Sequence, residues 1–495
     1  MGKFFFITST LPRIHGGRTK SLLQRAFLLN KSNVALTIVS TNYNSEYQDI
    51  YNFYYGKNKI LKNTRFENIY DYYKNKYFVK NEKQSWKILF NNNVKNIDNY
   101  VRVKRSKKSN RTYFYDGGIP KVVIKQAKNE NVPVFFALYH EWNFNPYKIF
   151  NINKDGVVHR IDTYDEKNVM ILQEFLLDSG DIYLTKKFSH NKLKTIILND
   201  HGNLIQFDSE KKWIAHFFNE IFTSEDVIIN DARLLDIPLL ETNVKKRIFQ
   251  LHSSHLSDPL DNQSSIKKSY ANILNTNFPN NDIIVSLTEQ QKQDILSKLP
   301  NLKDNIRVIP HSITTKQLQY KKSKNHFGIV SRLDAGKNIE DAINAFKLFN
   351  QEIPNYILDI YGDGERRNRL MELTKALNLE DSVIFHGNVD NVDEAYQKIY
   401  ALLITSNFEG FALMALESIS NGTPVVTYEV KYGPTDIIDS TSGWVTKFRT
   451  PDSLKEEMIY AIKEPKNPTQ VQKRALIFSE EIFVDRWLEV LEING

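Results

Sequence analysis

Short apolar runs alternate with amphipathic stretches at both ends of this chain. Residues 3–8 form the first apolar run, a loop with Gly16 and Gly17 follows it, and residues 19–29 have the spacing of a helix. Residues 34–40 form the next apolar run. Runs of this length that alternate with helices are typical of buried parallel strands, so the pattern predicts a doubly wound α/β domain.

The pattern changes over residues 76–204. Here the apolar runs are short and alternate in polarity, and turn sequences such as Asp116-Gly117-Gly118 and Lys154-Asp155-Gly156 separate them. Glycine and aspartate at such positions are typical of hairpin connections between antiparallel strands. We therefore predict that residues 76–204 form an inserted antiparallel β domain.

The alternation of strands and helices resumes after Trp213, and a polar, lysine-rich stretch at residues 316–325 indicates a linker. The pattern therefore predicts an α/β protein with two doubly wound domains. We place the first domain at residues 1–75 and 205–315, the second at 316–475, and a last helix at 476–495 that packs back on the first.

Residues 401–417 combine features that suit an anionic ligand. The apolar run 401–404 ends in a loop that holds Glu409, and helix-forming residues follow Gly410. The free backbone N–H groups at a helix start favour an anion. A carboxylate beside such a site suits an uncharged polar group such as a sugar hydroxyl. The alternative is a surface loop and an ordinary helix with Glu417 exposed.

Two cations follow the first buried run of the second domain. Arg332 and Lys337 stand five residues apart after residues 327–330. Such a pair can neutralise a leaving diphosphate without a metal, although two solvated loop cations are the plainer alternative. In the first domain His252 and His255 follow an apolar run; no further ligand cluster is evident beside them, so we predict no metal site.

Arg332 and Lys337, followed by Glu409 and Glu417, resemble the signature of the family 4 retaining glycosyltransferases. That resemblance implies the GT-B fold, in which two Rossmann-like domains face each other across a cleft. It implies a diphosphate clamp of Arg332 and Lys337, a donor sugar held by Glu409 and His252, and a nucleotide ribose bonded to Glu417. The other donor contacts that it implies are Gly16, Gly17, His386, Gly387, Asn388, Gly410, Phe411, Ala412 and Leu413.

The same resemblance implies a UDP-sugar substrate, no cofactor and no metal. The acceptor hydroxyl attacks on the face that the diphosphate leaves, and a phosphate oxygen takes its proton, which retains the anomeric configuration. A double displacement stays open, with Glu409 an unlikely nucleophile in that route.

The inserted β domain restricts the resemblance to one group of enzymes within this family. Together with residues 19–25 and the tyrosine-rich run after them, it is similar to the wall teichoic acid α-glycosyltransferases, and most to their poly(glycerol-phosphate) α-glucosyltransferase branch. This implies transfer from UDP-glucose to glycerol-phosphate units, in a homo-oligomer such as a trimer formed through the insertion. Transfer of N-acetylglucosamine from UDP-GlcNAc to poly(ribitol phosphate), or to a serine-rich adhesin, is the alternative.

The net charge of +8 also favours a polyanionic partner. Six cations of the insertion lack a neighbouring acid and could contact an acceptor polymer: Arg102, Lys104, Arg105, Lys107, Lys108 and Arg111. The alternative is a sheet edge protected by charge.

A non-catalytic protein that binds polyanions is the competing class of function. We expect no nucleic acid partner, because no RNA-binding motif combines the basic and aromatic residues, and a binding protein has no need of two carboxylates beside two cations. The sequence has no cysteine and no run of 18 apolar residues. We therefore expect a cytoplasmic protein, with peripheral contact at the inner face of the membrane.

Overall fold

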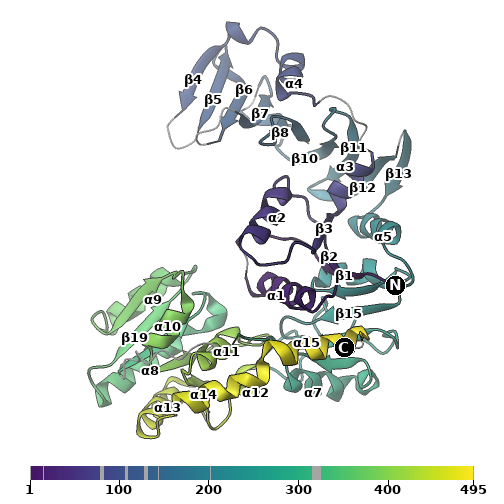
Figure 1. Cartoon of the computed structure of the whole chain (residues 1–495). Coiled ribbons are helices and arrows are strands. Elements are labelled where there is room, and N and C mark those ends of the chain that lie inside the picture. Colours follow the sequence, from purple (N-terminus) through teal and green to yellow (C-terminus); the bar gives the residue numbers. More distant parts are fainter. Residues whose placement is uncertain are drawn as a thin grey trace.

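The computed structural model describes residues 2–14, 16–77, 83–105, 110–127, 132–142, 144–200, 202–314 and 325–493. These residues form three sheets, of seven, ten and six strands. The seven-stranded and six-stranded sheets belong to two α/β lobes, and the ten-stranded sheet forms a separate layer against the first lobe (Figure 1).

The N-terminal lobe is built on a parallel sheet in the order β17-β16-β15-β14-β1-β2-β3. Its strands are β1 (Phe4–Thr8), β2 (Leu36–Ser40), β3 (Arg65–Asn68), β14 (Val227–Asn230), β15 (Lys246–Gln250), β16 (Ile283–Ser286) and β17 (Ile306–Val308). Its helices are α1 (Gly17–Lys31), α2 (Tyr47–Gly56), α3 (Ile69–Lys76), α5 (Glu210–Ile221), α6 (Asp236–Leu240) and α7 (Glu289–Lys298).

Strand β1 shows why this sheet is buried on both faces. Phe6 belongs to the core that α1 covers, whereas Phe5 and Ile7 belong to the core on the opposite face. Successive side chains of a strand point to opposite faces, so a continuous apolar run supplies both cores.

The C-terminal lobe has a parallel sheet in the order β20-β19-β18-β21-β22-β23. Its strands are β18 (His326–Val330), β19 (Ile357–Tyr361), β20 (Val383–Gly387), β21 (Ala401–Ile404), β22 (Val425–Thr427) and β23 (Gly443–Val445). Its helices are α8 (Ile339–Glu352), α9 (Arg367–Ala376), α10 (Val392–Lys398), α11 (Leu413–Ser420), α12 (Pro434–Ile437), α13 (Pro451–Lys463) and α14 (Pro468–Ala475).

The inserted sheet is antiparallel, and each strand pairs with the next one in the sequence. Its strands are β4 (Val101–Arg105), β5 (Arg111–Asp116), β6 (Ile119–Gln126), β7 (Pro133–Tyr139), β8 (Pro146–Ile152), β9 (Val158–Tyr164), β10 (Met170–Leu176), β11 (Ile182–Ser189), β12 (Lys192–Asp200) and β13 (Asn203–Phe207). This confirms the inserted antiparallel sheet, although β13 passes the predicted boundary at residue 204, because Asn203–Phe207 completes a hairpin with β12.

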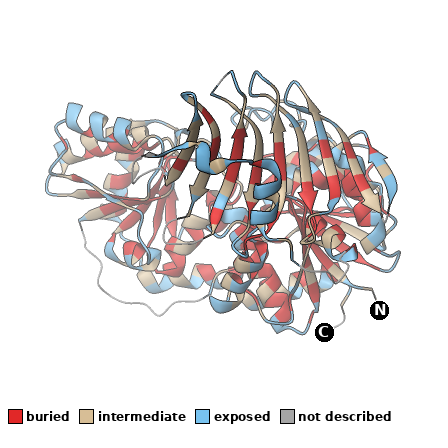
Figure 2. Cartoon of the chain, turned by 90° about the horizontal axis from the view of Figure 1, so that it is seen from above, coloured by how far each residue is buried: buried red, intermediate tan, exposed pale blue. Residues whose placement is uncertain are grey.

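Different ends of this sheet have different partners. Phe90 of α4 (Trp86–Asn93) packs with Phe136 and Phe150, whereas Leu184 and Ile196 pack with α3 and α5 of the N-terminal lobe. Buried residues therefore run through the middle of the sheet, and its loops are exposed (Figure 2).

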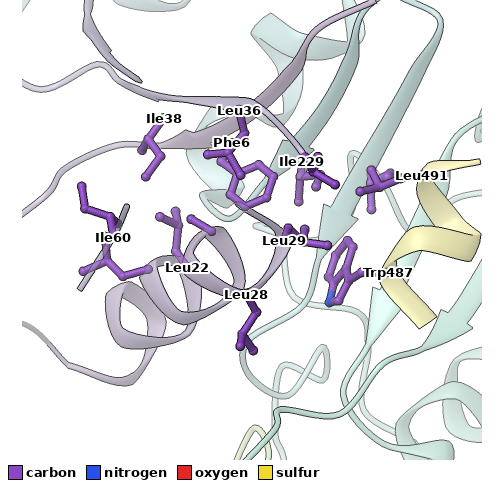
Figure 3. Close-up of a cluster of buried hydrophobic side chains, with 14 of the residues drawn as sticks. Phe6, Leu22, Leu28, Leu29, Leu36, Ile38, Ile60, Ile229, Trp487 and Leu491 are labelled. Carbon is purple, nitrogen blue, oxygen red and sulfur yellow. The ribbon is translucent and has the colours of Figure 1, made fainter. Parts of the chain in front are cut away.

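The last helix, α15 (Glu480–Leu491), returns to the N-terminal lobe. Its Trp487 and Leu491 lie in one core with Phe6 and Leu29 (Figure 3). Most of the predicted linker at 316–325 lies outside the described residues. None of the described helices is both long and apolar enough to span a membrane.

Candidate active site

The first turns of α1 and α11 face each other across the two lobes. A Cβ atom on Gly17 would lie 3.8 Å from Leu413 Cδ1, and Lys20 Nζ lies 2.7 Å from Glu417 Oε1. Gly410 lies so close to the N-terminal lobe that a Cβ atom there would be 2.2 Å from the carbonyl oxygen of His252. Residues that the sequence predicts for one site, from both lobes, therefore meet at one place.

Lys337 and Glu409 form an ion pair within the C-terminal lobe. Lys337 Nζ lies 2.5 Å from Glu409 Oε1, and the two side chains are only 13% and 11% exposed. Ser406 Oγ donates a second hydrogen bond, of 2.7 Å, to the same carboxylate oxygen. The cation and the carboxylate are thus held in place before a ligand arrives.

Backbone contacts fix the loop that carries Glu409. The Glu409 N–H donates to the Lys431 carbonyl and the Tyr432 N–H donates to the Glu409 carbonyl, each at 2.9 Å. Lys431 and Tyr432 in turn bond Asp294 on α7 of the other lobe, at 2.6 and 2.8 Å. The loop position therefore depends on how the two lobes meet.

Arg332 is not held in this way. Its side chain is 80% exposed and bonds Asp334, with 3.1 Å between Nη2 and Oδ2. The family resemblance implies that Arg332 and Lys337 form one clamp, whereas in the structure Lys337 pairs with Glu409 and Arg332 pairs with Asp334. Arg332 has to exchange Asp334 for a ligand if it is to bind a diphosphate.

Glu417 connects three elements. Besides Lys20 on α1, it accepts a 3.0 Å hydrogen bond from the Tyr396 hydroxyl of α10. Burial, together with the nearby Glu417 carboxylate, raises the pKa of Tyr396 well above its usual range, so the hydroxyl keeps its proton and donates. A ribose hydroxyl that binds Glu417 would compete with Lys20.

Helix α11 starts later than the sequence indicates. Gly410, Phe411 and Ala412 precede the helix, which begins at Leu413. Ala412 has a φ of 62°, a left-handed conformation that costs a residue other than glycine some energy. Strained backbone of this kind often accompanies functional loops, here one that brings Gly410 against the other lobe.

His252 is held by a carboxylate that is not among the predicted site residues. Its Nε2 lies 2.6 Å from Asp231 Oδ1, and Arg25 binds the other oxygen of Asp231. Asp231 follows the buried strand β14 directly, as His252 follows β15 closely. A polar residue after a buried parallel strand is the signal that could have found it, because strand ends meet at one edge of a sheet.

His311 is a second histidine of this region, and it is not among the predicted site residues. Its ring stacks on that of His252, with centroids 6.3 Å apart, and its Nδ1 lies 3.1 Å from Ser21 Oγ. Burial, with the nearby His252 and Arg25, lowers its pKa to about 3, so His311 is neutral. It lines a cavity of about 390 Å³ between the lobes that Lys20, Leu413 and Glu417 also line.

His255 lies in a different environment from His252. It is fully buried and stacks on Tyr432, with centroids 6.1 Å apart. Within the described ranges, no group of three histidine, aspartate or glutamate residues could hold a metal ion.

The predicted base site lies at the end of β20. His386 and Gly387 belong to this strand instead of a loop, because β20 pairs with β19 as far as Gly387. His386 stacks on Tyr361, with centroids 4.4 Å apart, and its Nε2 lies 2.7 Å from Asp359. Asn388 follows directly. Among the described residues, no hydrogen bond or ion pair joins this group directly to the Lys337–Glu409 pair.

The basic residues of the insertion that the structure describes lie on β4 and β5, at one edge of the sheet. Arg102 is exposed, and Arg111 stacks on Phe135. Lys104 and Arg105 are in β4, but Lys107 and Lys108 lie outside the described residues. In Figure 1, β4 and β5 lie at the top of the molecule, apart from the place where α1 and α11 meet.

Comparison with known proteins identifies a family for the C-terminal part of the chain. Residues 312–476, which hold Arg332, Lys337, Glu409 and Glu417, match the family of glycosyl transferases group 1. The chain carries a group 1 glycosyltransferase domain.

Relatives extend the likeness over the whole chain. The chain is 25% identical to poly(glycerol-phosphate) alpha-glucosyltransferase of Bacillus subtilis (strain 168), over 98% of this chain and 74% of the relative. It is 23% identical to poly(ribitol-phosphate) alpha-N-acetylglucosaminyltransferase of Staphylococcus aureus (strain COL), over 99% of both chains.

A solved structure shows the same fold. The crystal structure of an S. aureus TarM mutant in complex with fondaparinux, alpha-GlcNAc-glycerol and UDP covers all of both chains, with a TM-score of 0.85 and 21% identity. The chain therefore has the GT-B fold, with the antiparallel sheet inserted in its first lobe.

Proposed function

We propose that this protein transfers glucose from UDP-glucose to glycerol-phosphate units of wall teichoic acid, with retention at the anomeric carbon. The observation that carries the proposal is the Lys337–Glu409 pair, because the loop that continues from Glu409 through Gly410 packs on the backbone carbonyl of His252 in the other lobe. A buried cation and carboxylate therefore lie in a loop that contacts the segment of a neutral histidine, and these three groups suit transfer of a sugar from a diphosphate.

The chemistry follows from the charges. A diphosphate that leaves the sugar gains negative charge, and Lys337 is already in position to neutralise it. When Lys337 turns to the phosphate, Glu409 can accept a hydrogen bond from a sugar hydroxyl. Because the pair is mostly shielded from water, these interactions are stronger than at the surface.

Retention follows if the acceptor hydroxyl attacks on the face that the diphosphate leaves, so that a phosphate oxygen takes its proton. Arg332 and Lys337 supply the positive charge in this scheme, and we propose that no metal is needed. Turnover that survives EDTA would agree with this, and turnover that EDTA abolishes and Mg²⁺ restores would contradict it.

The relatives' names support the acceptor class and leave two donor sugars. Transfer of N-acetylglucosamine to poly(ribitol phosphate) is the second candidate, because the relative with that name matches 99% of both chains. Both relatives act on a polymer of alditol phosphate, according to their names. The basic edge at Arg102 and Arg111 is consistent with such an anion.

The test offers UDP-glucose and UDP-N-acetylglucosamine, each with glycerol-phosphate and with ribitol-phosphate polymer. We expect transfer of glucose to the glycerol polymer. Transfer of N-acetylglucosamine to the ribitol polymer alone would replace the proposal by its second candidate. Donor hydrolysis with neither polymer modified would contradict both, and a serine-rich peptide would then be the next acceptor to test.

Substitution tests the proposed chemistry. Lys337→Ala should lower kcat/KM, because the transition state loses about 2–4 kcal/mol of stabilisation, as for other preorganised electrostatic groups. Arg332→Ala should have a smaller effect, because Arg332 is exposed. Lys455→Ala, which breaks a lysine–glutamate pair of 2.8 Å elsewhere in the same lobe, is the control. Near-normal turnover of Lys337→Ala would remove Lys337 from the mechanism.

We also propose a homo-oligomer formed through the inserted sheet, in the cytoplasm at the inner face of the membrane. The edge strand β4 supports the first part, because Val101 and Val103 are 67% and 40% exposed on it. Light scattering on the purified protein should show a trimer or a similar assembly, and Val101→Lys should dissociate it. A monomeric parent protein would contradict the proposal.

A further inference from the structure

Arg25 and Asp231 form an ion pair that is removed from water. Arg25 lies on α1 and Asp231 follows β14, and their side chains are 1% and 0% exposed. Burial of two charges costs free energy that their attraction does not always recover. Such a pair therefore needs a reason beyond stability.

The reason lies in the second oxygen of Asp231. Oδ2 binds Arg25 and Oδ1 lies 2.6 Å from His252 Nε2. Burial alone would raise the pKa of Asp231, but Arg25 and His252 outweigh it and lower the pKa to about 2. Asp231 is therefore ionised and can only accept hydrogen bonds.

An acceptor at this position decides where His252 carries its proton. Burial lowers the pKa of His252, against the opposing effect of Asp231, so the ring is neutral near pH 7. A neutral imidazole has one N–H group and one acceptor nitrogen. Because Nε2 faces a carboxylate, the N–H group is at Nε2 and Nδ1 is an acceptor.

Arg25 is itself held on both sides. Its guanidinium carbon lies 4.7 Å from the ring centroid of Phe6 and 4.7 Å from that of Trp487. Trp487 belongs to α15 and is fully buried against α1 (Figure 3). Gln250 accepts a further hydrogen bond of 3.4 Å from Arg25 Nη1. Asp231 therefore has little freedom to turn away from His252.

We propose that Asp231 is a positioning residue that fixes His252 in the tautomer with the proton on Nε2. Nδ1 then accepts a hydrogen bond from a hydroxyl of the donor sugar. Arg25, between Phe6 and Trp487, keeps Asp231 in place. The role in transfer rests on the proposed function, whereas the tautomer is a property of the protein itself.

The experiment combines Asp231→Asn with nitrogen NMR of ¹⁵N-histidine protein at pH 7.5, without substrate. His252→Gln identifies the His252 signals by their loss. We expect Nε2–H in the parent protein. In Asp231→Asn the amide oxygen should face Arg25 and the amide N–H₂ should face His252, which moves the proton to Nδ1. In a Ser-His-Asp triad the same exchange lowers kcat by about 10⁴ through the wrong tautomer.

For turnover we expect a loss of about 100-fold or more in kcat for Asp231→Asn, and little further loss when the exchange is made in His252→Gln. Asp282→Asn is the matched control, because Asp282 is equally buried and bonds Arg247 at 2.8 Å in the same lobe. It should lower the Tm and leave the His252 tautomer and kcat unchanged.

Nδ1–H in the parent protein would overturn the proposal, whether or not Asp231→Asn folds. A kcat of Asp231→Asn within threefold of the parent, or an equal further loss in His252→Gln, would also overturn it. If the protein transfers no sugar from either donor, the proposed function fails while the NMR result still stands.

Discussion

Lys20 of α1 and Glu417 of α11 form an ion pair between the two lobes, with 2.7 Å between Nζ and Oε1. Glu417 is the carboxylate proposed to bond the donor ribose. In this structure a cation of the other lobe occupies it.

Removal of that cation should help the donor to bind. The pair is partly exposed, so it contributes up to about 1 kcal/mol. We expect Lys20→Met to lower the KM for the UDP-sugar by up to about fivefold, with kcat little changed. Lys31→Met, at the other end of the same helix, is the control. A higher KM in Lys20→Met would mean that Lys20 binds the donor itself.

Gly410→Ala should separate the lobes. Its Cβ atom would lie 2.2 Å from the His252 carbonyl oxygen and 3.2 Å from Ser253 Cα, so the backbone has to move. We expect kcat/KM to fall by about 100-fold, since a shift of about 1 Å at a reacting centre can have that effect. Gly56→Ala is the control, because nothing lies within 4 Å of the added atom. Equal activity of both variants would show that the lobes do not need this contact.

His255 should make the protein less stable in acid. Burial lowers its pKa to about 4, against an ordinary value of 6.5, with Asp294 opposing the shift. Below pH 6.5 the unfolded chain binds a proton at this position that the folded protein does not bind. The free energy of unfolding therefore decreases as the pH is lowered from 6.5 to about 4. At about 1.4 kcal/mol per pH unit, the total is roughly 3 kcal/mol.

His255→Phe should remove this dependence, because a phenyl ring can stack on Tyr432 and does not titrate. The readout is the difference in unfolding free energy between the variant and the parent, measured from pH 7.5 to 4. Asp236, whose pKa burial raises to about 7, acts in the opposite direction and cancels in that difference. Parallel curves for the two proteins would contradict the assignment.

Arg102 and Arg111 should affect only the binding of the acceptor polymer. With both changed to alanine, we expect transfer to a phosphate polymer to weaken and to depend less on salt, because surface charges are screened. Donor hydrolysis should not change. Lys192→Ala with Lys194→Ala removes the same charge from β12 and is the control. An equal loss in both double variants would point to net charge instead of a contact at this edge.

The fold follows the apolar pattern closely where a strand is buried on both faces. β21 is apolar throughout and β1 is apolar except for Thr8, and the pattern predicts both strands. β3, with the sequence Arg65-Phe66-Glu67-Asn68, was not expected, because only one of its four residues is apolar. It forms at the edge of the sheet, where backbone pairing with β2 decides the structure.

The site residues that belong to local sequence motifs could be predicted. Lys337 and Glu409 both follow buried strands, and family spacing selects them. The contacts between distant segments were not predictable: Lys20 and Glu417 are 397 residues apart, and Arg25 and Asp231 are 206 apart. No periodic pattern relates such positions, since only packing of the lobes and of α1 brings them together. For the same reason the sequence does not show that Arg332 is exposed.

The return of α15 to the first lobe has a consequence for biosynthesis. A ribosome completes the N-terminal lobe's sheet long before it makes Trp487, and N-terminal domains generally fold first. Until Trp487 arrives, Arg25 lacks one of the two rings that enclose it. The apolar face of the nascent first lobe therefore stays exposed until the second lobe and α15 have been translated. If translation stalls before that point, chaperones and proteases can bind the exposed face.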